Sequence, residues 1–245
     1  MLVDCSNDGY YTSFLCSECG SIMRYHVDCK RRICVSCNKK RSDKLIKKYS
    51  NIEHYFLDGN TFFVTFTLKN VYDVVVGVSR IRKAFKDLCR RHPYNVWFAG
   101  GLYAIECSPN IDGSFNVHIH ACIDCVLDLS RGRKTELNED WYDVTGDSYI
   151  VDWQPSRHVS SAISYCLKYT TKEVDFGDYA LSVEDALHGI RMLSFFGVLY
   201  NFKGISFVSG GLHCLSCGSG YVSFFSGGRE IGFHHDLKKP PDVVV

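Results

Sequence analysis

Residues 115–124 read FNVHIHACID, which places two histidines one residue apart inside an apolar and β-branched run. Successive side chains of a β-strand point to opposite faces of the sheet, so His118 and His120 share one face. The apolar residues that alternate with them point the other way, toward a core. The stretch therefore predicts a strand with one apolar face and one face that carries two imidazoles.

The preceding segment is predicted to pair with this strand as a hairpin. It consists of the strand-like GGLYAIECS (100–108) and the turn-forming PNIDG (109–113). Glu106 then occupies a position from which its carboxylate can lie beside the two imidazoles. Two imidazoles and a carboxylate can hold a divalent ion that polarises a phosphate oxygen. The alternative is a solvated strand face with two ordinary histidines. The interpretation as a metal site therefore needs support from a second candidate segment elsewhere in the chain.

Hydrophobic periodicity predicts the remaining elements. Alternation predicts strands over 60–70 and 148–154, and three-and-four spacing predicts a helix over 73–91. Further helices are expected from 156 to about 172 and over 183–200. This order of elements predicts an α+β fold, in which helices pack on one face of an antiparallel sheet.

The composition is that of a globular protein. The chain has 245 residues, of which 46% are hydrophobic and 14% aromatic, enough for a substantial core and a smaller module. No apolar run approaches the ~20 residues that span a bilayer, and the N-terminus lacks an apolar signal core. We therefore expect a soluble, cytoplasmic protein with no membrane partner.

The formal net charge of +1 conceals an uneven distribution. Residues 24–48 contain ten Lys or Arg against two Asp, whereas residues 136–152 contain six Asp or Glu and no Lys or Arg. The sequence thus predicts a local basic face, although such a charge run is also typical of a solvated helix face.

A second candidate for chemistry is AISYCLKYTTKEVDF (162–176). Tyr165 and Tyr169 are four residues apart and lie on one helix face, and Lys168 and Lys172 each follow a tyrosine by three residues. A phenol with a pKa near ~10 is a poor nucleophile at neutral pH, so it needs an adjacent cation and an activated phosphate. The alternative is an amphipathic helix with half-buried packing tyrosines.

Three segments, in this order, resemble the motifs of the HUH endonucleases and, within them, the replication initiator (Rep) proteins of rolling-circle plasmids. They are FFVTFTLKN, NVHIHACI and YCLKYTTK, and the resemblance covers roughly residues 29–176. It implies the ferredoxin-like fold of Rep nucleases and a nickase that cuts one DNA strand through a 5′-phosphotyrosine. It also implies Mg²⁺ or Mn²⁺ held by His118 and His120, with Glu106 as third ligand. The implied substrate is an origin that is single-stranded or extruded as a hairpin.

The resemblance also bears on which tyrosine attacks. In similar plasmid initiators the nucleophile is the tyrosine of the KY step, with a carboxylate four residues earlier. Here that earlier position is Tyr165, which is similar to the paired tyrosines of initiators from isometric single-stranded-DNA phages. We predict Tyr169 as the first nucleophile and Tyr165 as a second, with Lys172 and Lys168 as supporting cations.

The N-terminal cysteines have the spacing of a metal site. CSECG (16–20) and CVSCNKKR (34–41) give two CxxC pairs separated by fourteen residues. Two thiolate pairs at this separation favour a four-coordinate structural Zn²⁺ site over thiols without a metal or a disulfide. The expected ligands are Cys16, Cys19, Cys34 and Cys37, with His26 or Cys29 as alternates.

Near the other end, HCLSCGSG (213–220) offers half a site. Cys214 and Cys217 are candidates for a second zinc, completed by His213, His234 or His235, and a simple turn with buried cysteines is the alternative. The segment 29–41 also resembles a Cys and Arg signature of plasmid initiators and of some HUH transposases. The basic residues expected to contact DNA phosphates are Arg31, Arg32, Lys39, Lys40 and Arg41.

These observations predict three consecutive parts: a zinc-binding basic module (1–50), a nicking domain (51–176) and a C-terminal helix with a Gly-rich and aromatic β region (177–245). The expected function is origin nicking and rejoining in rolling-circle replication. The alternatives are an HUH-class transposase of an insertion sequence and a non-catalytic, zinc-stabilised DNA-binding regulator. Because the chain has no GxxxxGK[ST] loop, unwinding is expected to come from a host helicase.

Overall fold

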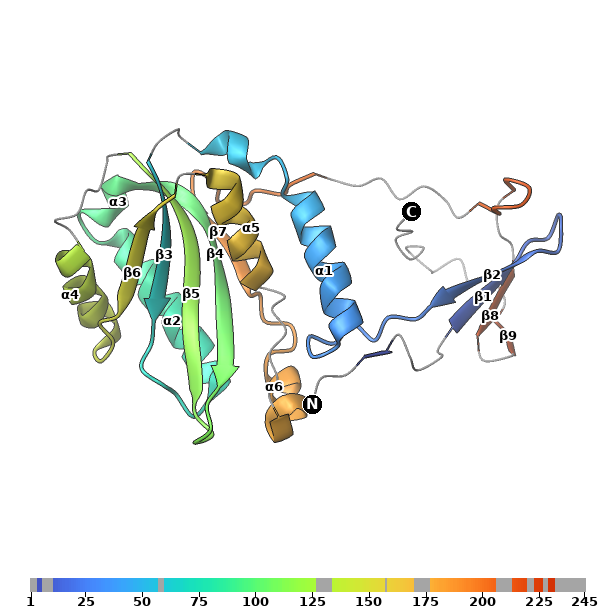
Figure 1. Cartoon of the computed structure of the whole chain (residues 1–245), viewed down its shortest axis with the longest axis horizontal. Coiled ribbons are helices and arrows are strands. Elements are labelled where there is room, and N and C mark those ends of the chain that lie inside the picture. The colour runs from blue at the N-terminus through green and yellow to red at the C-terminus, as the bar shows by residue number, and fades with distance from the viewer. Residues whose placement is uncertain are drawn as a thin grey trace. The chain divides into compact units, whose positions relative to one another are not determined.

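The computed structural model divides the chain into two compact units (Figure 1). The large unit comprises residues 1–3 and 31–205, and the small unit comprises residues 4–30 and 206–245. This division differs from the three consecutive parts expected, since both ends of the chain contribute to the small unit. The structure describes residues 4–5, 11–56, 60–126, 134–156, 158–169, 177–205, 213–219, 223–226 and 229–231.

The large unit contains a five-stranded sheet in the order β6-β3-β5-β4-β7, in which all neighbours are antiparallel. The predicted α+β class with an antiparallel sheet is confirmed. The strands are β3 (Thr61–Thr67), β4 (Phe98–Pro109), β5 (Phe115–Cys125), β6 (Val151–Pro155) and β7 (Leu193–Gly197).

One face of this sheet packs on α2 (Val74–Arg90) and α4 (Lys134–Thr145). The odd-numbered apolar residues of β5, such as Val117 and Ile119, lie in this core, as the alternation predicted. Asp73 fixes the start of α2, because its Oδ1 accepts hydrogen bonds from the amides of the next turn.

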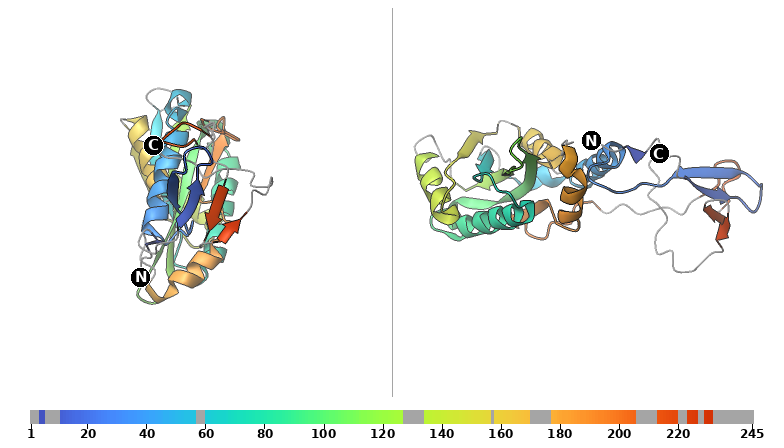
Figure 2. Two further views of the ribbon diagram at one scale, coloured as in Figure 1. Left: turned by 90° about the vertical axis from the view of Figure 1, so that its right-hand side faces the viewer. Right: turned by 90° about the horizontal axis from the view of Figure 1, so that it is seen from below.

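The other face packs on α5 (Val159–Tyr169), so α2 and α5 lie on opposite sides of the sheet (Figures 1 and 2). The expectation of helices on one face is wrong. Its physical reason is that the second face of β4 and β5 also carries apolar side chains: Leu102 and Cys122 point away from the first core and join a second one. A second helical layer, which includes the end of α1 (Val35–Lys48), covers them.

Two elements differ from the sequence prediction. Only the start of the range 183–200, where one helix was expected, is helical, in α6 (Ala180–Ala186), whereas Leu193–Gly197 form β7 and pair with β4. Helix α4 replaces a stretch read as an acidic connection. The short helical elements are η2 (Ile52–Tyr55), α3 (Tyr94–Trp97) and η4 (Gly177–Tyr179).

The small unit contains a four-stranded sheet in the order β2-β1-β8-β9. Its N-terminal hairpin pairs with C-terminal strands through β1 and β8. Among the helices in the described ranges, none has the length and hydropathy needed to cross a membrane. The strands are β1 (Tyr11–Leu15), β2 (Ile22–His26), β8 (Ser223–Ser226) and β9 (Arg229–Ile231).

Candidate functional site

The strand register brings the two histidines and the glutamate together on the α5 side of the sheet. Glu106 on β4 is the cross-strand partner of His118 on β5. Nε2 of His120 lies 2.7 Å from Oε2 of Glu106, and both side chains are buried, while His118 is half-buried. The predicted hairpin is therefore confirmed, with Glu106 in direct contact with His120 and the rings of His118 and His120 6.1 Å apart.

Two threonines of β3 support the imidazoles from the other side. Thr65 and Thr67 are the cross-strand partners of His120 and His118. Their Oγ1 atoms lie 3.2 Å and 3.0 Å from Nδ1 of His120 and His118, respectively. These hydrogen bonds orient both rings. In each ring Nδ1 contacts a threonine hydroxyl, so Nε2 points away from that threonine. The sequence analysis missed this role, although the alternation of β3 places both threonines on one face.

The contact between His120 and Glu106 bears on the tautomer of a neutral imidazole. If Nε2–H donates to the carboxylate, Nδ1 accepts from the hydroxyl of Thr65. Metal ligation through Nε2 requires the opposite tautomer, in which Nδ1–H donates to the same hydroxyl. A threonine hydroxyl serves both states because it donates and accepts. The contact with Thr65 is therefore compatible with a metal ion at Nε2 of His120.

Helix α5 lies against this cluster. Tyr165 makes an edge contact with Phe63, with ring centroids 5.0 Å apart, and Phe63 stacks on His120 at 6.0 Å. The thiol of Cys166 lies 3.5 Å from the backbone oxygen of His120. One aromatic ring therefore separates Tyr165, which is 47% exposed, from the buried imidazole.

The other residues expected on this helix are placed only in part. Tyr169 is the last residue of α5, one turn beyond Tyr165, and its side chain lies outside what the structure describes. Lys168 is exposed. Lys172 lies outside the described residues.

The cysteines are grouped differently from the expected set. Cys16 and Cys19 share a cluster with Cys214 and Cys217, in which all four Sγ atoms lie within 4.8 Å of one another. The physical reason is the pairing of β1 with β8, which brings the two segments together. The two predicted half-sites at opposite ends of the chain thus form one cluster that could hold a metal ion.

The remaining candidate zinc ligands lie elsewhere. Cys34 precedes the first residue of α1 and Cys37 lies in its first turn, both buried and both in the large unit. Cys29 is exposed, and the side chain of His26 lies outside the described residues, as do His234 and His235. His213 is exposed.

The pKa values of two thiols in the cluster shift in opposite directions. The hydroxyl of Ser21 lies 2.9 Å from Sγ of Cys214. This hydrogen bond, with further bonds from backbone amides, lowers the pKa of Cys214 to about 5. The pKa of Cys16 is instead raised to about 11, because desolvation and the neighbouring thiols outweigh the lowering effect of a backbone hydrogen bond at Cys19.

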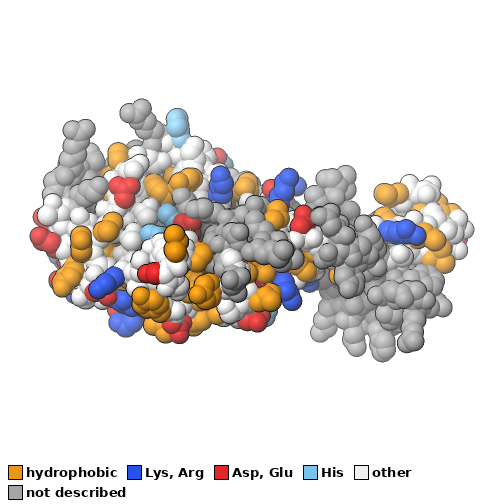
Figure 3. Space-filling view, turned by 60° about the horizontal axis from the view of Figure 1, so that its bottom comes forward, with side chains coloured by type: hydrophobic (Ala, Val, Ile, Leu, Met, Phe, Trp, Pro, Cys, Tyr) orange, Lys and Arg blue, Asp and Glu red, His pale blue; other side chains and the backbone are white. Residues whose placement is uncertain are grey.

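The basic residues expected to bind DNA are not equivalent. Arg32 has a structural role: its backbone amide donates to the carboxylate of Glu184, and its guanidinium donates to the carbonyl of Ile190 at 2.7 Å. Arg41 is half-buried and donates to Oδ1 of Asn38 at 2.7 Å. Arg31, Lys39 and Lys40 are exposed. Figure 3 shows acidic, basic and apolar side chains mixed over one face of the large unit.

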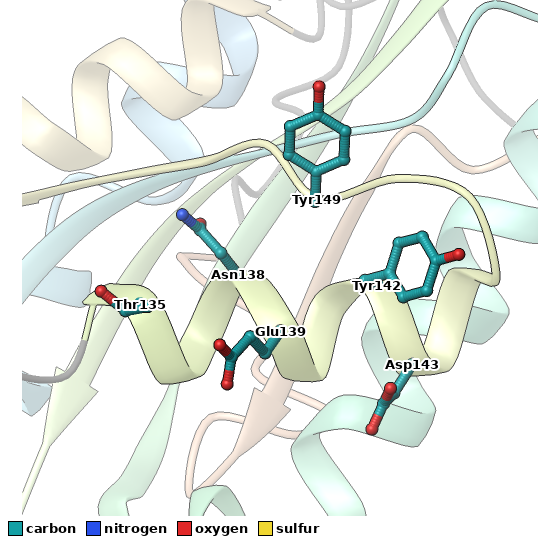
Figure 4. Close-up of a pocket in the computed structure, with 6 residues that line it drawn as sticks. All are labelled: Thr135, Asn138, Glu139, Tyr142, Asp143 and Tyr149. Atoms are coloured by element: carbon teal, nitrogen blue, oxygen red, sulfur yellow. The ribbon is translucent and has the colours of Figure 1, made fainter.

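A surface pocket lies away from the histidine cluster (Figure 4). It is formed by α4 and the segment that follows it. Two of its side chains are the carboxylates Glu139 and Asp143, so the pocket is unsuited to a phosphate backbone. Its described lining consists of Thr135, Asn138, Glu139, Tyr142, Asp143 and Tyr149.

Comparison with known proteins identifies the family. A family described as "Replication protein" matches residues 22–206, which is more than half of the chain. The chain belongs to this replication protein family. The predicted resemblance to rolling-circle plasmid replication initiators is thereby confirmed, and a replication initiator binds DNA.

Curated relatives of the replication protein agree with this assignment. "Protein rep" of Lactiplantibacillus plantarum is 25% identical over 76% of this chain and 72% of its own length. "Protein rep" of Streptococcus pneumoniae serotype 2 is 27% identical over 60% of this chain and 49% of its own length. "Replication protein" of Staphylococcus aureus is 24% identical over 56% of this chain and 69% of its own length. No solved structure matches the replication protein.

Proposed function

We propose that this replication protein nicks and rejoins one DNA strand at the origin of a rolling-circle plasmid, with a tyrosine of α5 as nucleophile. The observation that carries the proposal is the contact of α5 with the histidine strand. Tyr165 reaches His120 through Phe63, and Cys166 touches the backbone of His120. These contacts support a reaction in which a phenol of this helix and the imidazoles act on one phosphate.

The proposed reaction is a bond exchange. The phenol oxygen of Tyr169 forms a bond to the scissile phosphorus and loses its proton, while the bond from phosphorus to the 3′ oxygen breaks and that oxygen gains a proton. The product is a 5′-phosphotyrosine and a free 3′-hydroxyl. Because the phosphodiester energy is conserved in the tyrosine link, the reverse reaction rejoins strands. Tyr165 serves as a second nucleophile, and Lys168 and Lys172 stabilise the phenolate charge.

Glu106, His118 and His120 are the residues that would hold Mg²⁺ or Mn²⁺ in this proposal. The donor set supports it, since one carboxylate oxygen and one imidazole nitrogen already converge at 2.7 Å. When bound, the ion would supply Lewis-acid polarisation of the scissile phosphate. Thr65 and Thr67 are positioning residues that orient the rings. Replacing Thr67 by Val should weaken Mn²⁺ binding roughly 10–100-fold, as is typical for loss of a residue that hydrogen-bonds a metal ligand.

The proposed substrate is single-stranded or hairpin-extruded origin DNA. A strand within B-form duplex does not readily present its backbone to a helix-borne tyrosine. The exposed Arg31, Lys39 and Lys40 suit contacts to backbone phosphates, which hold DNA without reading its sequence. A separate host helicase would unwind the plasmid.

The decisive experiment incubates the full chain with single-stranded origin oligonucleotides and Mn²⁺ and detects a covalent protein–DNA adduct on a denaturing gel. We expect Tyr169→Phe to abolish the first adduct, His120→Ala to reduce it strongly, and Tyr165→Phe to impair only the second transfer. Tyr149→Phe, at an exposed tyrosine beside α4, is the matched control and should leave the adduct unchanged.

Three outcomes would contradict the proposal or its assignment of the nucleophiles. Absence of an adduct with wild type on every candidate origin would favour a non-catalytic DNA-binding regulator. An adduct only on the ends of an insertion sequence would favour a transposase. Full adduct with Tyr169→Phe and none with Tyr165→Phe would reverse the order of the two nucleophiles.

A further inference from the structure

Two short segments at opposite ends of the chain share one sequence pattern. Residues 16–21 read CSECGS and residues 214–219 read CLSCGS, so both follow Cys-x-x-Cys-Gly-Ser. We call them the first and second knuckle. Both belong to the small unit, and the pattern they share is independent of the histidine and tyrosine motifs.

The two knuckles also share one backbone geometry. In each, the amide of the glycine donates to the carbonyl of the first cysteine, at 2.9 Å in the first knuckle and 2.7 Å in the second. The amide of the first cysteine donates to the carbonyl of the final serine, again at 2.9 and 2.7 Å. Gly20 and Gly218 have φ values of +69° and +74°, a left-handed conformation that glycine adopts without strain. A turn of this kind lets both thiols of a CxxC pair reach one ion.

The thiols of the two knuckles interleave. Sγ of Cys16 lies 3.5 Å from Sγ of Cys217, and Sγ of Cys19 lies 3.5 Å from Sγ of Cys214. Zn–S bonds of ~2.3 Å at tetrahedral angles place sulfurs ~3.8 Å apart, close to these separations. The closest contacts run between the knuckles, so each knuckle supplies half of a four-sulfur shell.

The sheet of the small unit brings the knuckles together through its backbone. Strand β1 ends at Leu15, immediately before Cys16, and Leu15 is the cross-strand partner of Ser223 on β8. The second knuckle lies just before β8 in the chain. The first knuckle therefore follows a strand, the second knuckle precedes a strand, and these two strands pair with each other. Backbone pairing thus helps to bring the four thiols together.

We propose that Cys16, Cys19, Cys214 and Cys217 bind one structural Zn²⁺, which closes the two ends of the chain into a single zinc ribbon. Four thiolates fill the tetrahedral shell and leave no open position, so the ion is structural rather than catalytic. The inference is independent of the nicking reaction, and its test does not use DNA.

The test is the zinc content of the full chain and of three variants, measured by elemental analysis after purification without chelators. The variants are Cys16→Ser with Cys19→Ser, Cys214→Ser with Cys217→Ser, and all four substitutions together. If the knuckles share one ion, each double variant loses one zinc per chain and the fourfold variant loses that same single zinc. A loss of two zincs in the fourfold variant, or no loss in either double variant, would overturn the proposal. Cys89→Ser with Cys125→Ser is the matched control and should lose none.

A second variant guards against loss of zinc through misfolding. Cys217→His keeps a fourth ligand that suits Zn²⁺ and Co²⁺. In the Co²⁺-loaded protein, we expect this variant to bind metal while its sulfur-to-cobalt charge-transfer absorption decreases and its visible bands shift. A spectrum identical to that of the wild type would show that Cys217 is not a ligand and would refute the four-thiolate site.

Discussion

The two units of the molecule are stabilised in different ways. The large unit buries aromatic and aliphatic side chains on both faces of its sheet. In the small unit, the residues whose burial is described include only three buried side chains, Cys5, Cys16 and Cys214. Apolar burial stabilises by about 25 cal/mol per Å², so the large unit has a driving force that the described part of the small unit lacks. Where the described residues form no apolar core, a bound metal can supply the stabilising cross-link.

Removal of the metal should break the small unit and spare the large one. Structural zinc contributes on the order of 10 kcal/mol of apparent binding free energy, which exceeds the stability of most small domains. We expect a high-affinity chelator to abolish the amide signals of residues 11–30 in heteronuclear NMR spectra and to preserve those of the central sheet. Addition of Zn²⁺ should restore them. Simultaneous loss of both sets of signals would mean that the two units share one stabilising core.

The complementary change removes the largest side chain of the apolar core. Trp141 is fully buried, its ring centroid lies 4.9 Å from that of Phe66, and its indole N–H donates to the carbonyl of Thr67 at 2.9 Å. Trp141→Ala should lower the free energy of unfolding of the large unit by about 3–5 kcal/mol. Urea denaturation followed by circular dichroism measures the loss, and the zinc content should not change. Tyr142→Ala, at an exposed neighbour on the same helix, should cost less than about 0.5 kcal/mol.

A smaller effect is expected at a buried carboxylate that anchors the start of α1. Glu184 accepts hydrogen bonds from the backbone amides of Arg32, at 2.8 Å, and Ile33, at 3.0 Å. Glu184→Gln removes the charge and one acceptor oxygen, so the free energy of unfolding should fall by about 1–3 kcal/mol. The measurement is again urea denaturation, with exposed Glu139→Gln as control. An equal loss of unfolding free energy in Glu184→Gln and Glu139→Gln would show that Glu184 is not a specific anchor of α1.

The smallest effect concerns thiols that are not metal ligands. Burial, with a further contribution from the charge of Glu106, raises the pKa of Cys107 to about 12. Its thiolate fraction at pH 8 is then roughly a thousandfold lower than that of an ordinary cysteine. We expect alkylation followed by mass spectrometry to leave Cys107 unmodified after chelation, while the four knuckle thiols react.

The same raised pKa gives a pH dependence with a definite sign. A group whose pKa is raised by folding contributes its stability below the unfolded value, near 9, and loses it as pH rises toward the folded value, about 12. The large unit should therefore lose stability as the pH rises from 9 toward 12. A rise in stability over this interval would contradict the assignment of a raised pKa to Cys107.

The local sequence pattern predicted those elements whose packing in the fold matches the hydrophobic periodicity of their own residues. Strand β5 was predicted because His118 and His120 alternate with apolar residues that lie in the core. Strand β7 was missed because Val183 and Leu187 do have helical spacing. The residues after them pair with β4, a contact that local spacing does not encode. Helix α4 was missed because its apolar contacts with the core come from only Leu137, Trp141 and Val144 in an otherwise polar segment.

The candidate site was predictable where its residues are adjacent in strands. Glu106 faces His118 because a tight hairpin fixes the register. The threonine partners come from β3, more than fifty positions earlier, and only the assembled sheet reveals them. The partner of Cys16 and Cys19 could not be read from spacing, because thiolate pairs at any distance can share an ion. The repeated Cys-x-x-Cys-Gly-Ser pattern was the signal that could have identified it.

The pairing of the two knuckles imposes an order of events during translation. Cys19 and Cys214 are 195 positions apart, so at ~5–20 residues per second the second knuckle emerges from the ribosome roughly 10–40 s after the first. Nearly all of the large unit is synthesised in that interval and can fold before its flanking segments meet. A chain whose translation stops before the second knuckle would contain every strand of the five-stranded sheet, but the thiols of its first knuckle would lack the other two thiols of the cluster.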